Sequence, residues 1–194
     1  MDLMELISGQ LGNEKVLKQL SNTTGADSSQ IQQAMKLGLP ALMQAMSKNA
    51  TSQDGASSLA KALDNHKDDN IEDVENFLKN VDTEDGSKIL NHILGSKNTS
   101  VQKNLAKQTG LKQDQASNLM SQLAPLLMGT LGKQKSSQKV DSSGLAGMLA
   151  GALGGQGKKD NNLMSSVSKL LDSDDDGSIV DDLSDMLGGF LKKK

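Results

Sequence analysis

The chain has 194 residues, enough for one sizeable core or two small ones, and a net charge of −3. It contains no cysteine, which excludes disulfides and thiolate metal sites, and its only aromatic residues are two phenylalanines. Strands favour β-branched and aromatic residues, whereas the abundant Leu, Met, Ala, Lys and Gln favour helices, so the composition predicts an all-α protein. The acidic amino terminus lacks the basic start of a secretion signal, and no apolar run approaches the ~20 residues of a membrane helix. We therefore expect a soluble, cytoplasmic protein with no membrane span.

The first predicted elements are three helices. Residues 1–9 carry apolar side chains at helical spacing, and a second helix is predicted to end at Gly25, because a helix often ends on a left-handed residue. The third helix is predicted to follow a cap at Asp27 or Ser28. Pro40 interrupts it, which fits either two short helices or one kinked helix.

The same pattern returns 85 residues later. Thr24-Gly25 recurs as Thr109-Gly110, and Pro40 recurs as Pro125, the only other proline in the chain. A repeat at a fixed offset without gaps indicates that one helical unit was built twice, so residues 1–132 are predicted to form a two-repeat helical domain. The further matched positions are Val16, Lys18, Leu20, Gln30, Met35, Leu42 and Met43, which correspond to Val101, Lys103, Leu105, Gln115, Met120, Leu127 and Met128.

The composition changes after the second unit. Residues 133–160 are rich in Ser, Lys and Gly and are predicted to be a linker with a short Gly/Ala/Leu segment, which either makes a self-associating contact or stays a flexible connection. Two amphipathic stretches around an Asp-rich segment predict a helix-loop-helix over residues 161–194.

The net charge differs between the two halves of the repeat region. Residues 51–86 contain ten acids and three lysines, a net −7, whereas residues 97–140 contain seven lysines and one acid, a net +6. The second unit also resembles a helix-turn-helix at Leu105–Ala116, which makes nucleic-acid binding the leading alternative function. Against it, the chain has no Arg, the commonest reader of guanine, and helix packing alone explains the motif. The candidate residues are Lys103 and Lys107 for phosphates, and Lys112, Gln113, Gln115, Ser117 and Asn118 for a groove.

The Asp-rich segment matches the start of a calcium loop. Acids stand at its first, third and fifth positions and a Gly at its sixth, but its twelfth position is Leu183 rather than a bidentate acid. A second Asp-Gly-Ser sequence, Asp85–Ser87, precedes a predicted helix without these spaced acids, so the segment either binds Ca²⁺ weakly or only caps a helix. The candidate ligands are Asp172, Asp174, Asp176, Ser178 and Asp182.

No enzyme motif is found. The two histidines, His66 and His92, have no recognisable nucleophile or metal-ligand partner in the sequence, and the Gly-rich stretch lacks the strand and Lys-Ser/Thr of a phosphate loop. We therefore expect no catalytic residues, no small-molecule substrate and no cofactor other than Ca²⁺.

The repeat, the stretch Asp85–Gly95 and the Thr-Gly…Pro-x-Leu-Met pattern resemble the bacterial YidB-like family, domain of unknown function number 937. The Asp-rich stretch 172–183 also resembles a segment that its members carry near the carboxyl terminus. The resemblance implies a bacterial source and a homeodomain-like helical fold, and it supplies no activity or site residues. Together these observations predict a non-enzymatic bacterial protein that acts through a protein partner or self-assembly.

Overall fold

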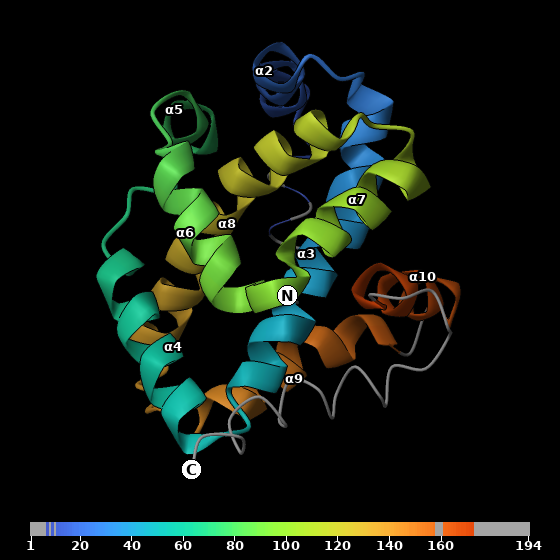
Figure 1. Cartoon of the computed structure of the whole chain (residues 1–194). Coiled ribbons are helices and arrows are strands. Elements are labelled where there is room, and N and C mark those ends of the chain that lie inside the picture. Colours follow the sequence, from blue (N-terminus) through green and yellow to red (C-terminus); the bar gives the residue numbers. More distant parts are fainter. Residues whose placement is uncertain (1–6, 8, 10, 158–160, 173–194) are drawn as a thin grey trace.

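The computed structural model describes residues 7, 9, 11–157 and 161–172, and every regular element in these residues is helical (Figure 1). The all-α prediction is therefore confirmed for this part of the chain. The elements in chain order are α2 (Glu14–Thr24), α3 (Ser28–Asn49), α4 (Gln53–His66), α5 (Val74–Lys79), α6 (Thr83–Leu94), the 3-10 turn η1 (Gly95–Lys97), α7 (Asn98–Thr109), α8 (Gln113–Ser137), α9 (Leu145–Gly157) and α10 (Asn161–Leu171).

The turns α2–α3 and α7–α8 are built alike. Gly25 and Gly110 end the first helix of each pair at φ +67° and +72°, a left-handed conformation that glycine adopts without steric cost. At the start of the next helix, Gln30 Oε1 accepts a hydrogen bond from the Asp27 amide (3.3 Å). Gln115 Oε1 accepts the corresponding bond from the amide of the residue that precedes α8, Lys112 (2.9 Å). The predicted Gly25 cap is thus confirmed, and the same cap recurs at the second turn.

Both prolines lie inside continuous helices, Pro40 in α3 and Pro125 in α8. Of the two alternatives, one helix rather than two short ones is therefore correct. Because proline has no amide hydrogen, Pro125 cannot donate to the carbonyl of Ser121 one turn earlier. Helix α6 approaches α8 at that carbonyl, where Gly86 lies so close that a β-carbon would stand 1.8 Å from the Ser121 oxygen. Beside it, the hydroxyls of Ser87 and Ser121 are hydrogen-bonded at 3.1 Å.

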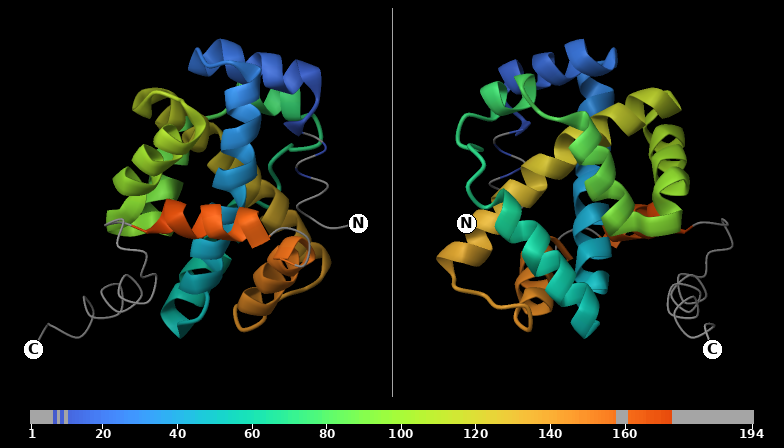
Figure 2. Two further views of the ribbon diagram at one scale, coloured as in Figure 1. Left: turned by 90° about the vertical axis from the view of Figure 1, so that its right-hand side faces the viewer. Right: turned by 60° about the vertical axis from the view of Figure 1, so that its left-hand side comes forward.

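Helices α3 and α8 cross near the centre of the molecule, and the shorter helices surround them (Figure 2). Helix α4 follows α3 in the chain but packs mainly against α8, and α9 follows α8 but packs against α3. From Ala116 to Leu131 only two residues of α8 are not buried, and the core around it consists of Leu, Ile, Val, Met and Ala side chains. Each half of the chain therefore completes its core with helices from the other half.

Two helices occupy residues that were expected to be linker, whereas α10 begins at residue 161 as expected. Helix α8 continues to Ser137, and α9 occupies much of the predicted linker, with Leu145 and Leu149 fully buried. Burial of these side chains against α3 stabilises a helix that its glycines weaken. Asp141 accepts hydrogen bonds from the Ser143 hydroxyl (2.7 Å) and the Gly144 amide (2.9 Å) just before α9, and these bonds lower the pKa of its carboxyl.

Helix α10 packs against α3 and α7, so it joins the same core. Val167 and Leu170 of α10 are buried there. The remainder of the predicted helix-loop-helix, residues 173–194, lies outside the described residues. Among the helices that the structure describes, none combines the length and the apolar composition needed to cross a membrane.

Candidate functional site

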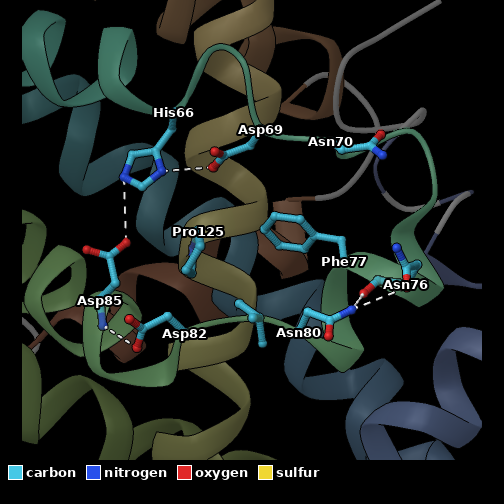
Figure 3. A pocket seen from close by; sticks show the side chains of 10 residues that line it. His66, Asp69, Asn70, Asn76, Phe77, Asn80, Asp82, Asp85 and Pro125 are labelled. Atoms are coloured by element: carbon cyan, nitrogen blue, oxygen red, sulfur yellow. Dashed lines mark hydrogen bonds and ion pairs between the residues drawn. The ribbon is translucent and has the colours of Figure 1, made fainter.

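A polar pocket of about 350 Å³ lies where the end of α4, the segment after it, α5 and the start of α6 meet α8 (Figure 3). Side chains from three separate stretches of sequence form its wall, and its apolar part comes from Phe77, Val81 and Pro125. The other lining residues are His66, Asp69, Asn70, Asn76, Asn80, Asp82 and Asp85.

His66 lies between two carboxylates in this pocket. Its Nδ1 is 2.9 Å from Oδ2 of Asp69, one turn further along the chain, and its Nε2 is 3.7 Å from Oδ2 of Asp85 in α6. The His66 side chain is 17% exposed, so it is the least accessible of the three.

The other polar side chains of the pocket hold the local backbone. Oδ1 of Asp82 accepts hydrogen bonds from the amides of Glu84 (2.8 Å) and Asp85 (3.1 Å), which fixes the first turn of α6. At the end of α5, Asn80 Nδ2 donates to the main-chain oxygen (2.8 Å) and the side-chain oxygen (3.2 Å) of Asn76. These bonds position the acidic start of α6 against the pocket.

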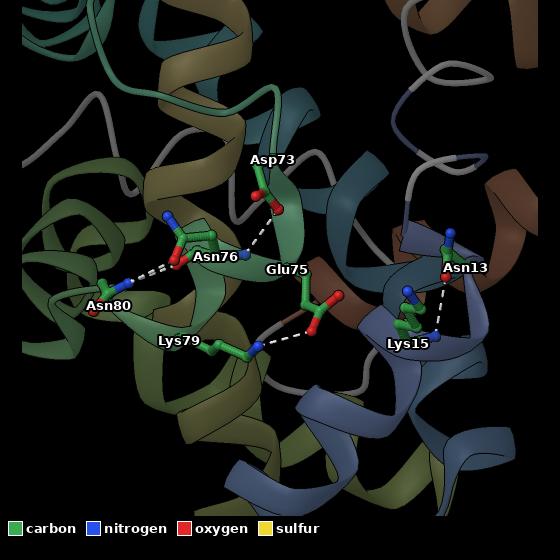
Figure 4. A network of polar contacts seen from close by, with 7 residues as sticks. All are labelled: Asn13, Lys15, Asp73, Glu75, Asn76, Lys79 and Asn80. Carbon is green, nitrogen blue, oxygen red and sulfur yellow. Dashed lines mark hydrogen bonds and ion pairs between the residues drawn. The ribbon is translucent and has the colours of Figure 1, made fainter.

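The short helix α5 is held by its own polar contacts (Figure 4). Asp73 Oδ1 accepts from the Asn76 amide at 3.0 Å, and Lys79 Nζ donates to Glu75 Oε1 at 2.7 Å. The hydrogen bond and charge of Lys79 lower the pKa of Glu75, and those of Glu75 raise the pKa of Lys79. The pair is exposed, so it orders the helix surface without adding much stability.

The pocket lining contains an imidazole, carboxylates and amides, which are hydrogen-bonding groups. Within the described residues, no group of three or more His, Asp or Glu side chains is arranged to hold a metal ion. His66 and Asp69 are three residues apart, a spacing that brings side chains together on a helix, so their contact could have been predicted. No sequence signal predicts that Asp85, from another helix, lies on the other side of His66.

Some of the candidate nucleic-acid residues are exposed, and others make hydrogen bonds within the molecule. Lys103, Lys107, Lys112 and Gln113 are exposed. Gln115 Nε2, by contrast, donates to the Gly25 carbonyl at 2.6 Å.

Two further polar side chains of α8 also contact α2. Asn118 Nδ2 donates to the Thr23 carbonyl at 3.1 Å, and Gln122 accepts from the Thr23 hydroxyl at 3.0 Å. In the opposite direction, Gln30 Nε2 donates to the Gly110 carbonyl at 2.7 Å. Polar side chains at the start of both long helices are therefore used between the two sequence copies.

The candidate calcium residues fall mostly outside the described part of the chain. Asp172 follows α10 and is 4% exposed. Its main-chain oxygen accepts from Asn104 Nδ2 at 2.9 Å, which ties the end of α10 to α7. Asp174, Asp176, Ser178 and Asp182 lie outside the described residues, so calcium binding stays a prediction.

Comparison with known proteins identifies one family. The family of bacterial proteins of unknown function called DUF937 matches residues 5–134, which is more than half of the chain. No curated protein and no solved structure matches. The matched region contains both copies of the Gly-ended turn and the whole polar pocket. The chain belongs to the DUF937 family of bacterial proteins of unknown function.

Proposed function

We propose that this protein is a non-enzymatic binding protein, built from two homeodomain-like copies of one helical unit, that acts through a protein partner or through self-assembly. The observation that carries the proposal is a reciprocal pair of hydrogen bonds. Gln30 donates to Gly110, and Gln115 donates to Gly25. Each residue lies 85 positions from its counterpart, so the first copy makes to the second the same contact that the second makes to the first.

Such reciprocity is typical of two identical subunits related by a two-fold axis. The helices are also exchanged between the two halves, because α4 of the first half packs on α8 and α9 of the second half packs on α3. The unit therefore associates with another helical unit through its turn and the start of its second helix. A helix-turn-helix protein would present that same surface to nucleic acid.

The self-assembly part of the proposal is tested by sedimentation velocity of the full chain over a range of concentrations, with calcium and with a chelator. We expect a sedimentation coefficient that rises with concentration. For a protein partner, a photo-crosslinking residue at exposed Lys36 or Lys103 is introduced in the source cell, and crosslinked chains are identified by mass spectrometry. A monomer at every concentration, combined with no crosslinked chain, contradicts both forms of the proposal.

The second candidate function is nucleic-acid binding through the exposed Lys103, Lys107 and Lys112. Gln115 and Asn118 are already hydrogen-bonded to the end of α2, so they are not available for contacts with base edges. The three lysines would therefore contact phosphates and bind without sequence specificity. Fluorescence anisotropy with duplex DNA at low salt tests it. Binding that weakens steeply with salt and is lost when the three lysines are changed to Glu supports it, whereas no affinity at low salt excludes it.

A further inference from the structure

We propose that the polar pocket around His66 binds a primary ammonium group carried on an apolar stem. This site is separate from the Gln30–Gly110 and Gln115–Gly25 hydrogen bonds that carry the proposed function, so its test succeeds or fails independently of that function. The shared chemistry is an alkylammonium, which can come from a free diamine or from the lysine side chain of another protein.

The Asp85 carboxylate lies beside the His66 ring without being hydrogen-bonded to it. His66 Nδ1 is 2.9 Å from Asp69 Oδ2, whereas Nε2 is 3.7 Å from Asp85 Oδ2, which is longer than a hydrogen bond. An ammonium group in the pocket can donate one N–H to the Asp85 carboxylate and direct its other N–H groups to neighbouring acceptors.

Three carboxylates line the pocket. Asp69, Asp82 and Asp85 each use one oxygen, towards His66 or the first amides of α6. Within the described residues, no contact is found for the second oxygen of any of the three, and no lysine lines the pocket. A cation bound there gains charge-assisted hydrogen bonds without displacing an existing ion pair.

The pocket also has an apolar side. Phe77, the only aromatic residue in the described part of the chain, is partly buried against the core and lines this wall. Figure 3 shows its ring and that of Pro125 between the His66–Asp85 pair and the amides of Asn76 and Asn80. An aromatic face attracts a cation and packs against an alkyl stem. With no metal-ligand arrangement in the described residues, these features favour an organic cation.

The experiment is a calorimetric and NMR titration of the full chain with cadaverine and, separately, with Nα-acetyl-lysine amide. Pentanol is the neutral comparison, because it has the stem without the charge. The test variant is Asp85→Asn, a half-exposed position whose carboxylate lies beside His66. The matched control is Asp54→Asn, an exposed acid in the first turn of α4 outside the pocket. Melting curves establish that both variants are folded.

We expect both amines to bind, pentanol not to bind, and Asp85→Asn to weaken binding about tenfold or more while Asp54→Asn leaves it unchanged. Phe77→Leu, which keeps an apolar wall, should weaken binding roughly threefold. NMR signals of His66 and Asn80 should shift with amine.

Either of two results overturns the proposal: no heat or signal shift with either amine at ~10 mM, or equal binding by wild type and Asp85→Asn. A tighter response to cadaverine identifies a free diamine as the source. A tighter response to the lysine derivative identifies a protein side chain.

Discussion

A single glycine decides how closely α6 and α8 approach. Pro125 leaves the Ser121 carbonyl without a donor in its own helix, and Gly86 packs its backbone directly over that oxygen. A β-carbon at residue 86 would collide with main-chain atoms of Ser121 that no rotamer change can move aside. Residue 86 must therefore lack a β-carbon, and glycine is required there although it is a poor helix former.

The variant Gly86→Ala should lower the free energy of unfolding by about 2–3 kcal/mol, because α6 must move away from α8. Urea denaturation measures it. Gly147→Ala is the matched control, since Gly147 is an exposed helical glycine where an added β-carbon would meet nothing within 4 Å. It should stabilise the protein by about 0.5–1 kcal/mol. Equal effects of the two variants would contradict the close contact.

At the scale of elements, each glutamine at the start of a long helix does two things. Its oxygen binds the amide of its own N-cap residue, while its nitrogen binds the carbonyl of the glycine that ends a helix in the other copy. One side chain thus fixes a helix start and attaches it to a distant turn. A glutamate at either position can still accept from the N-cap amide, but it has no N–H group to donate to the glycine carbonyl. The substitution therefore removes the contact between the two copies and keeps the helix cap.

The variants Gln30→Glu and Gln115→Glu should each cost about 1–3 kcal/mol, because a carboxylate then faces a carbonyl oxygen. Thermal or urea unfolding of each variant measures the cost. Gln33→Glu, at an exposed position of α3, should stay within ~0.5 kcal/mol of wild type. A large effect at only one of the two glutamines would show that the contacts are not equivalent.

At the scale of the molecule, the local features were predictable and the long-range ones were not. The all-helical class and the Gly25 cap follow from composition and spacing within one unit, and the family follows from the resemblance of its motifs. The docking of α9 was missed, because its glycines indicate a weak helix and its burial depends on α3. The His66–Asp85 contact was missed for the same reason, since it joins two helices whose approach depends on the whole core.

The docking of α9 and α10 can be tested by shortening the chain. A protein that ends at Ser143 loses the burial of Leu145, Leu149, Val167 and Leu170, each of which contributes about 1.5–3 kcal/mol before the entropy of ordering is subtracted. Its urea midpoint should fall clearly below that of a chain ending at Asp172, which keeps every described helix. Identical midpoints would mean that residues 144–172 add nothing to the core.

The exchanged packing also has a consequence for synthesis. Helix α4 leaves the ribosome well before α8, the helix against which it mainly packs. The apolar faces of α4 and α6 therefore stay uncovered until the chain has been made through about Ser137 and α8 has emerged. The amino-terminal half is consequently the part of the nascent protein whose apolar faces wait longest for their packing partner.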